Sequence, residues 1–198
     1  MKYAGTKDFS IDFLVTGIGS TLTTYALTKK TSIKKYDIII NAGIAGSFNT
    51  ALKIGEVVNV HSDEFADLGI EDKNEFFTLF EKGFIKKDEL PFTDCKLSNL
   101  TNLSLNLKNV SGITVNTTHG NKNSIELFKN KFKADIETME GAAFFYVCLN
   151  ENVNFLQIRA ISNYVEERNN ANWDIPVAIN NLNEKLFELI DVIKNKGI

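Results

Sequence analysis

The sequence predicts a single α/β domain in which helices cover a largely parallel sheet, and two observations support this class. Apolar, β-branched runs alternate along the chain with segments of helical periodicity, which is the pattern of βα units. The composition agrees, because 198 residues with 43% hydrophobic and 24% charged residues are typical of one globular domain with a substantial core. Residues 1–198 are therefore expected to form one domain without repeats or linkers.

The first half of the chain contains three expected strands and one helix. Residues 9–19 form a β-rich run that ends in a Gly-x-Gly turn, and residues 20–30 follow as a helix with Ser20 as its N-cap. Residues 36–48 predict a buried strand, since the run is too apolar for a strand with one wet face. Residues 55–65 are expected to form the next strand because apolar and polar residues alternate there.

The second half begins with the least regular part of the chain, residues 66–110. There we expect a hairpin over 76–85 and loop or edge structure over 97–109. The remaining expected elements are, in order, a strand and turn at 112–120, a helix at 123–131, a helix that starts near residue 138, a strand at 153–162 and an amphipathic helix at 174–196 with Pro176 in its first turn.

Charge and composition exclude several classes of function. A net charge of −3 with scattered lysines gives no basic stripe for nucleic acid. No apolar run approaches the ~20 residues of a membrane span, and the first ten residues lack the apolar core of a signal peptide. Cys95 and Cys148 are isolated, which fits a reducing compartment. We therefore expect a cytoplasmic protein that binds neither nucleic acid nor membrane.

Neither a metal nor a cofactor is expected. His61 and His119 stand far apart, with no Cys or second His at zinc-ligand spacing. The "TGIGST" turn lacks the third glycine of a dinucleotide fingerprint, and "GIAG" lacks the Lys-Ser/Thr ending of a P-loop. Gly43 and Gly46 in the latter are equally well explained by tight backbone geometry.

Glu140 is the residue of greatest chemical interest, because it stands at the front of an apolar run from Met139 to Leu149. If Thr138 caps the helix, Glu140 lies in the first turn, where the helix dipole favours a negative charge. Its two acceptor oxygens suit a pair of adjacent donors, such as the vicinal hydroxyls of a ribose. A purely structural carboxylate, paired with the dipole or with Arg159, explains the residue as well.

Three segments resemble a known family when they are taken together. "NAGIAGSF", "TMEGAAF" and "RAISNYV", in this order and spacing, are similar to the nucleoside phosphorylase/nucleosidase superfamily over about residues 10–190, and most of all to its futalosine hydrolases. The resemblance implies a three-layer α/β/α sandwich with a mixed central sheet. It also implies a homo-oligomer, dimeric or larger, that uses no cofactor and acts on a purine nucleoside.

The same resemblance implies roles for individual residues. Met139 and Glu140 inherit ribose binding, and Glu140 would anchor the ribose during catalysis. The other residues implied to line the substrate site are Gly43 and Ile44 in the glycine loop, Thr118 and His119 in the base-contacting loop, Ser162 and Asn163 at the base, and Trp173 over it. For His119 a loop residue without a role, and for Trp173 core packing, are alternative interpretations.

Asn163 bears on the choice of base. The adenine-specific nucleosidases of the superfamily have Asp after the serine, which accepts from both N7–H and the 6-amino group. An Asn amide offers one acceptor and one donor, which match N7–H and O6 of hypoxanthine. The sequence thus favours hydrolysis of a 6-oxopurine nucleoside, with Asn163 assisting departure of the base. A turn-forming role for "SN" is the alternative.

Water is the expected nucleophile. Phosphate needs arginine and hydroxyl donors, but the chain has two arginines in all, Arg159 and Arg168, and an apolar Ile44 where many family members have a hydroxyl. The family also begins with a strand and an acidic residue that orients the water, whereas this sequence starts at what resembles the second strand. The expected fold lacks that strand. The alternatives are a methylthioadenosine/adenosylhomocysteine nucleosidase, a purine nucleoside phosphorylase, and a truncated nucleoside-binding relative without turnover.

Overall fold

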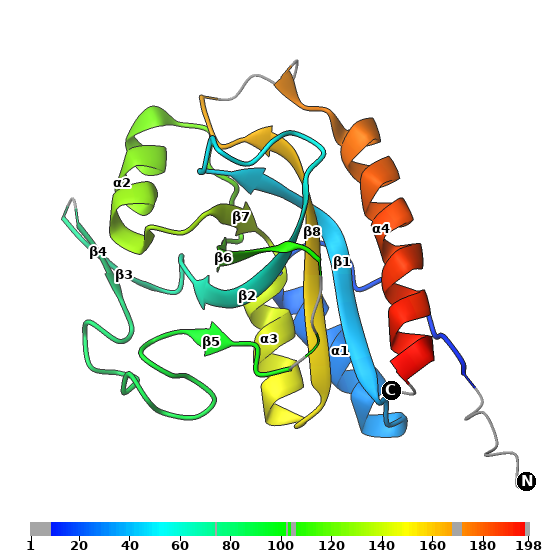
Figure 1. Ribbon diagram of the computed structural model, residues 1–198. Helices are drawn as coiled ribbons and strands as arrows, with labels where there is room; N and C mark the ends of the chain where they lie inside the picture. Colours follow the sequence, from blue (N-terminus) through cyan, green and yellow to red (C-terminus); the bar gives the residue numbers. More distant parts are fainter. Residues whose placement is uncertain (1–8, 74, 102, 104–105, 168–171, 197–198) are drawn as a thin grey trace, which may run out of the picture.

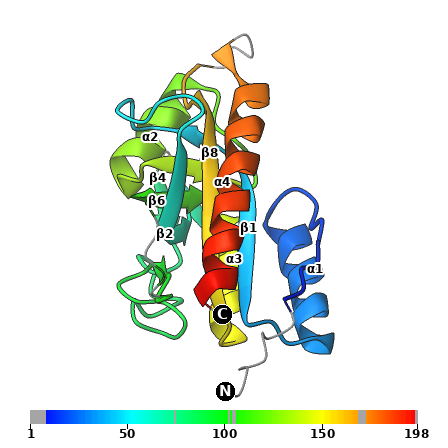
Figure 2. The same ribbon diagram turned by 45° about the vertical axis from the view of Figure 1, so that its right-hand side comes forward.

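The computed structural model describes residues 9–73, 75–101, 103, 106–167 and 172–196. It consists of three layers (Figures 1 and 2). Helices α1 (Ser20–Ile33) and α3 (Gly141–Asn150) pack together on one face of the sheet, and α4 (Ile175–Lys196) covers the other. Helix α2 (Lys122–Phe132) lies at one end of the molecule. The expected α/β/α sandwich is confirmed.

The central sheet is mixed, and the pairing of its strands β2 and β8 closes it on itself. Its strands are β1 (Ile38–Ser47), β2 (Val57–Phe65), β5 (Leu97–Ser98), β6 (Lys108–Thr114), β7 (Ile136–Thr138) and β8 (Asn154–Tyr164), in the order β5-β2-β6-β7-β1-β8. Strand β1 is parallel to β8 and antiparallel to β7, while β2 pairs with both β6 and β8. A separate hairpin consists of β3 (Gly69–Asp72) and β4 (Glu75–Thr78).

Three clusters of buried apolar side chains hold the layers together. One lies between the sheet and α3, and includes Phe145 and Phe155. The second lies under α2, where Phe128 and Phe132 pack on Ile113. The third lies under α4, where Leu182 and Leu189 face Ile158 and Ala160 of β8. The apolar stripe of the last helix therefore covers β8, in which every residue from Phe155 to Asn163 is buried.

The N-terminal prediction is wrong, since residues 9–17 form no strand. Among the described residues β1 pairs along its whole length with β8, but on its other edge β7 meets only Gly46 and Ser47. A strand needs a partner edge, and the 9–17 segment instead runs beside α1, where Asp12 binds Lys30 and Lys34. For the same reason β1 is mostly half-buried, with Ala42 exposed, rather than fully buried as its apolar run suggests.

Several boundaries also differ from the sequence-based expectation. The N-cap of α1 is Gly19, not Ser20. The hairpin lies at 69–78 instead of 76–85, because the latter run continues into turns after Thr78. Strand β6 begins at Lys108, inside the expected loop, because it gains β2 as a parallel partner. It ends at Thr114, and residues 115–120 form a loop.

No helix among the described residues is long and apolar enough to span a membrane.

Candidate active site

Glu140 lies at the junction of β7 and α3. The expected arrangement, with Thr138 as N-cap and Glu140 in the first turn, is wrong by two residues: Glu140 is itself the N-cap, and its side chain makes no capping hydrogen bond. The short β7, which the sequence does not reveal, takes up residues 136–138. Hydroxyl oxygens cap the helix instead, since Oγ1 of Thr138 accepts from Gly141 N–H at 3.2 Å and Oγ1 of Thr114 accepts from Ala142 N–H at 2.7 Å. The Glu140 carboxylate is thus left for other partners.

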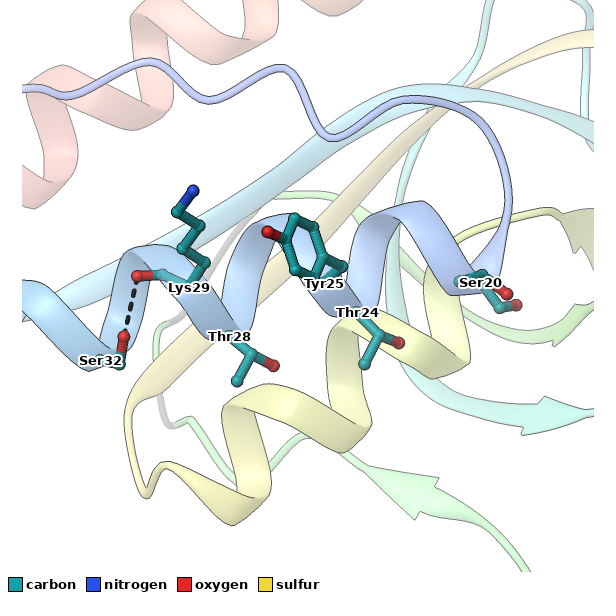
Figure 3. Close-up of a pocket in the computed structure, with 7 residues that line it drawn as sticks. Ser20, Thr24, Tyr25, Thr28, Lys29 and Ser32 are labelled. Carbon is teal, nitrogen blue, oxygen red and sulfur yellow. Dashed lines mark hydrogen bonds between the residues drawn. The ribbon is translucent and has the colours of Figure 1, made fainter.

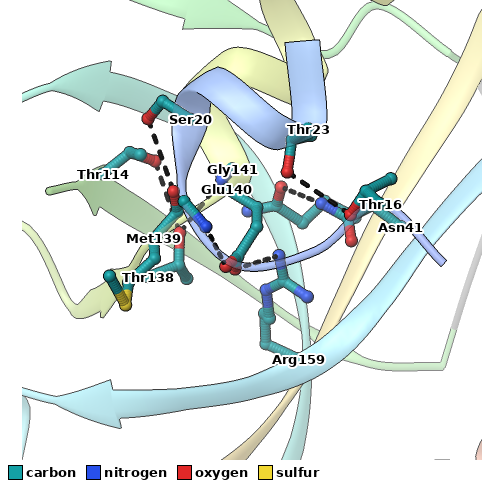
Figure 4. A network of polar contacts seen from close by, with 12 residues as sticks. Thr16, Ser20, Thr23, Asn41, Thr114, Thr138, Met139, Glu140, Gly141 and Arg159 are labelled. Carbon is teal, nitrogen blue, oxygen red and sulfur yellow. Dashed lines mark hydrogen bonds and ion pairs between the residues drawn. The ribbon is translucent and has the colours of Figure 1, made fainter. Parts of the chain in front are cut away.

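Two groups hold this carboxylate in place (Figure 4). The backbone N–H of Gly19 donates to Oε1 at 3.0 Å, and Nη2 of Arg159 lies 3.8 Å from Oε2. Gly19 has a φ of 93°, a conformation that favours glycine, so the Gly-x-Gly turn serves to bring this N–H to the carboxylate. The side chain of Glu140 remains 22% exposed. An oriented carboxylate with spare lone pairs can accept hydrogen bonds from a ligand.

Arg159 has buried hydrogen-bond donors at the site, a feature that cannot be recognised from the sequence. Its side chain is 2% exposed, yet Nε and Nη2 have no hydrogen-bond acceptor among the described residues. Burial lowers the pKa of this guanidinium, while Glu140 and Asp63 raise it. Gly43 makes room for it, since a Cβ there would lie 2.2 Å from Nη1. Buried donors without acceptors are costly, so they mark a place where a bound molecule or water is stabilised.

A buried network supports the loop that carries Glu140. Asp63 is fully buried, and its carboxylate accepts from Oγ1 of Thr114 at 2.8 Å and from Nε2 of Gln157 at 3.0 Å. Burial raises the pKa of Asp63 to about 7, against these two hydrogen bonds, which lower it. Thr114 is the same residue that caps α3, so the network fixes the start of the helix beside Glu140.

This raised pKa predicts a dependence of stability on pH. Between about pH 4 and pH 7 the unfolded chain releases the Asp63 proton while the folded chain retains it. The free energy of unfolding should therefore fall as pH rises through this window, by up to about 4 kcal/mol, and then level off. Urea unfolding of the native chain and of Asp63→Asn at half-unit pH intervals measures the effect. The Asn variant should lack this slope, and parallel curves for the two proteins would contradict it.

Ser162 and Asn163 lie at the end of β8, both buried. Oγ of Ser162 donates to Oδ1 of Asn163 at 2.8 Å, and Nδ2 of Asn163 donates to the carbonyl oxygen of Tyr164 at 2.9 Å. A carbonyl can only accept, so the amide nitrogen faces Tyr164 and the orientation of the amide is determined. One lone pair of Oδ1 and one N–H of Nδ2 remain for a ligand.

His119 and Glu137 form a second buried pair at the same end of β1. The backbone N–H of His119 donates to Oε1 of Glu137 at 3.0 Å, and its ring Nδ1 bonds Oε2. Their side chains are 8% and 4% exposed. Thr118, the neighbour of His119, is half-buried, as is Met139 next to Glu140. The sequence gives no signal for the partnership with Glu137, because the two residues come from a loop and from a strand that is too short to predict.

Two other predicted site residues differ in how they lie relative to these groups. Ile44 packs with the third cluster, under α4, so it does not reach Glu140. Trp173 is half-buried ahead of α4, and the backbone N–H of its neighbour Asp174 donates to the carbonyl oxygen of Ser162 at 2.8 Å. Arg168 lies outside the described residues. A hollow on the outer side of α1 is lined mainly by hydroxyl groups and by Tyr25 and Lys29, without a carboxylate (Figure 3). It offers none of the chemistry that gathers around Glu140.

The fold defines a class of protein, and a family model identifies that class. The model of the phosphorylase superfamily matches residues 13–193, so the chain belongs to this superfamily. The predicted relationship to futalosine hydrolases is also confirmed. Futalosine hydrolase of Thermus thermophilus is 26% identical over 195 residues, which are 96% of this chain and 85% of that protein. The 5'-methylthioadenosine/S-adenosylhomocysteine nucleosidase of Buchnera aphidicola is 28% identical over 95% of this chain and 82% of its own length. The predicted class of enzyme, a nucleosidase, is thereby confirmed.

Solved structures agree on the fold. A futalosine hydrolase mutant of Helicobacter pylori superimposes with a TM-score of 0.73 at 21% identity, over 89% of this chain and 78% of that one. The nucleosidase of Colwellia psychrerythraea in complex with adenine gives 0.72 at 20% identity, over 89% and 76%.

Proposed function

We propose that this chain hydrolyses the N-glycosidic bond of futalosine and releases hypoxanthine. The observation that carries the proposal is the Asn163 amide, which keeps one acceptor and one donor after its bonds to Ser162 and Tyr164. This pair complements N7–H and O6 of a 6-oxopurine, whereas a 6-amino base protonated at N7 offers two donors. Futalosine hydrolases among the relatives support the choice of substrate.

The placement of the polar groups fits one nucleoside. Arg159 lies beside Gly43 and Asn163 beside Gly46, three residues further along β1. That separation is about 10 Å at the rise of a strand, which a nucleoside spans from its ribose hydroxyls to its base edge. The ribose diol would donate to Glu140 at one end, and the base would meet Asn163 at the other. As the bond to the base breaks, the carboxylate stabilises the cationic character of the ribose.

The remaining steps concern the nucleophile and the proton. Water attacks the ribose from the face opposite the base, and the unpaired donors of Arg159 can hold an oxygen next to Glu140. An amide cannot donate a proton as a carboxylic acid can, so Asn163 stabilises protonated N7 without supplying its proton. That proton comes from water or from another group.

Phosphorolysis is the second candidate, because the same donors of Arg159 would also suit an anionic nucleophile. Against it, the apolar Ile44 packs under α4 and supplies no phosphate donor. A methylthioadenosine nucleosidase is the rival on grounds of similarity, and a nucleoside-binding protein without turnover is the rival outside the enzymes. Homo-oligomeric assembly and a cytoplasmic location stay predictions from the sequence.

Product analysis separates these candidates. The protein is incubated with futalosine, inosine or methylthioadenosine, each with and without phosphate, and the products are resolved by chromatography. Hypoxanthine should be released at the same rate in phosphate-free buffer, together with a free reducing sugar. A ribose 1-phosphate product would establish phosphorolysis instead. Cleavage of methylthioadenosine alone would overturn the substrate, and binding without cleavage would overturn the enzymatic function.

A further inference from the structure

His119 and Glu137 face Asn163 across a single glycine. Gly46 of β1 pairs with Glu137 of β7 on one side and with Asn163 of β8 on the other. Gly46 and Glu137 are in register, so they project to the same face of the sheet. The ladder of β1 and β8 is irregular between Ala45 and Gly46, so the face of Asn163 follows from its contact with Gly46. A Cβ on Gly46 would lie 3.2 Å from Nδ2 of Asn163, which means that the amide extends over this glycine. The amide therefore leans toward the strand that carries Glu137.

The distance between β7 and β8, which lie on either side of β1, is large enough to hold the edge of a planar base between them. Two strand spacings separate the Cα atoms of Glu137 and Asn163, which is about 10 Å. Asn163 and Glu137 stand at the two sides of this interval, and Glu137 holds the His119 imidazole. Along a 6-oxopurine, N7, O6 and N1–H follow one another on a continuous edge. If Asn163 binds N7 and O6, the group on the other side of Gly46 is placed to meet N1.

Glu137 fixes the chemistry of the imidazole. An ionised carboxylate can only accept, so the proton of a neutral His119 ring resides on Nδ1, and Nε2 then carries a lone pair. None of the described residues hydrogen bonds to Nε2. The ring is also held from the side by Phe128, whose centroid is 4.1 Å away. The structure thus provides a buried, oriented acceptor on the Glu137 side of Gly46.

We propose that Nε2 of His119, oriented by Glu137, accepts the N1–H of a 6-oxopurine base and thereby helps to select it. This inference rests on the proposed function, and it adds a second determinant of base choice. A 6-amino purine has a lone pair at N1 rather than a proton, so two acceptors would face each other. Leaving a buried polar group without its partner weakens binding by about tenfold or more. Glu137 acts as a positioning residue.

Base binding measured by calorimetry tests this proposal without requiring turnover. The probes are hypoxanthine and 1-deazahypoxanthine, in which a C–H replaces N1–H and a proton on N3 keeps the 6-oxo form. The native chain should bind hypoxanthine about tenfold or more tightly than the deaza analogue. His119→Phe should bind the two bases about equally. Glu137→Gln should also reduce the difference in affinity between the two bases, because a Gln amide can donate to Nδ1 of His119 and move the ring proton to Nε2.

His61→Gln provides the control, since His61 bonds the carbonyl oxygen of Val110 and takes no part in the site. This variant should keep the full preference for hypoxanthine. Equal binding of the two bases by the native chain overturns the role of His119 even if every variant fails to fold. A preference that persists in folded His119→Phe overturns it as well. Failure to bind any 6-oxopurine, with binding of adenine, would instead overturn the proposed function.

Discussion

Replacing Glu140 by Gln is expected to lower turnover at least about tenfold, the equivalent of ~1.4 kcal/mol in the activation free energy. The substitution keeps the size of the side chain but removes its charge and one acceptor. Gly19 N–H and Nη2 of Arg159 face different oxygens of the carboxylate, so only one of them would keep an acceptor. The ribose diol would also lose an acceptor, and the reacting ribose would lose its counter-charge. Initial rates at saturating nucleoside measure the effect.

Glu126→Gln supplies the matched control, because Glu126 is an exposed residue of α2 and the change in charge is identical. Its turnover should equal that of the native chain. The Glu140 variant should also unfold at nearly the same urea concentration as the native chain, which separates lost chemistry from lost structure. Unchanged turnover in Glu140→Gln would leave the carboxylate with a structural role only, as the ion-pair partner of Arg159.

The parts of the fold that the sequence predicts are those with strong local patterns. The apolar runs of β1, β2 and β8 and the amphipathic stripe of α4 are visible without knowledge of their partners, because burial alone dictates them. The three-residue β7 has no such pattern. It exists because β1 and β6 lie on either side of it, and these contacts cannot be read from residues 136–138 alone.

The candidate site also contains some residues that can be identified from the sequence and others that cannot. Glu140 is conspicuous as a polar residue at the front of an apolar run, and the resemblance to the superfamily draws attention to Asn163. Arg159 reads as one charged residue in a strand, and its unpaired donors become evident only when Gly43 and Glu140 are placed around it. The partnership of His119 with Glu137 depends on the register between β7 and β1. Functions that depend on non-local contacts remain hidden in a single sequence.

The same reasoning explains the error at the N-terminal end. Residues 9–17 have the composition of a strand, but a strand forms only when a neighbouring edge satisfies its backbone. In the described structure the segment runs alongside α1, and its apolar residues Phe13 and Val15 are 90% and 93% exposed. Local propensity favours a strand in this segment, but its tertiary contacts with α1 leave it without pairing to the sheet.

Replacing Asn163 by Asp is expected to reverse or abolish the preference for 6-oxopurine nucleosides. In the native chain the Asn163 amide accepts from N7–H and donates to O6, and discrimination built on matched polar groups reaches about 10⁴–10⁵. An Asp carboxylate presents two acceptors, which suit the N7–H and 6-amino donors of adenine and repel O6. Ser162 Oγ can still donate to the carboxylate, whereas Tyr164 loses the N–H that it accepts, so total activity should also fall.

The measurement compares kcat/KM for a 6-oxopurine nucleoside and its 6-amino counterpart that carry the same 5′ group, so that contacts with this group cancel. Asn180→Asp is the matched control, because Asn180 is an exposed residue of α4 and its amide bonds Glu184 of the same helix. The native chain and this control should favour the 6-oxopurine, and Asn163→Asp should not. If the native chain cleaves the 6-amino nucleoside and leaves the 6-oxopurine untouched, Asn163 does not read the base in the proposed way. An unaltered preference in Asn163→Asp would assign base selection to other groups, with His119 the first to examine, because its contact with N1 discriminates between the same two bases.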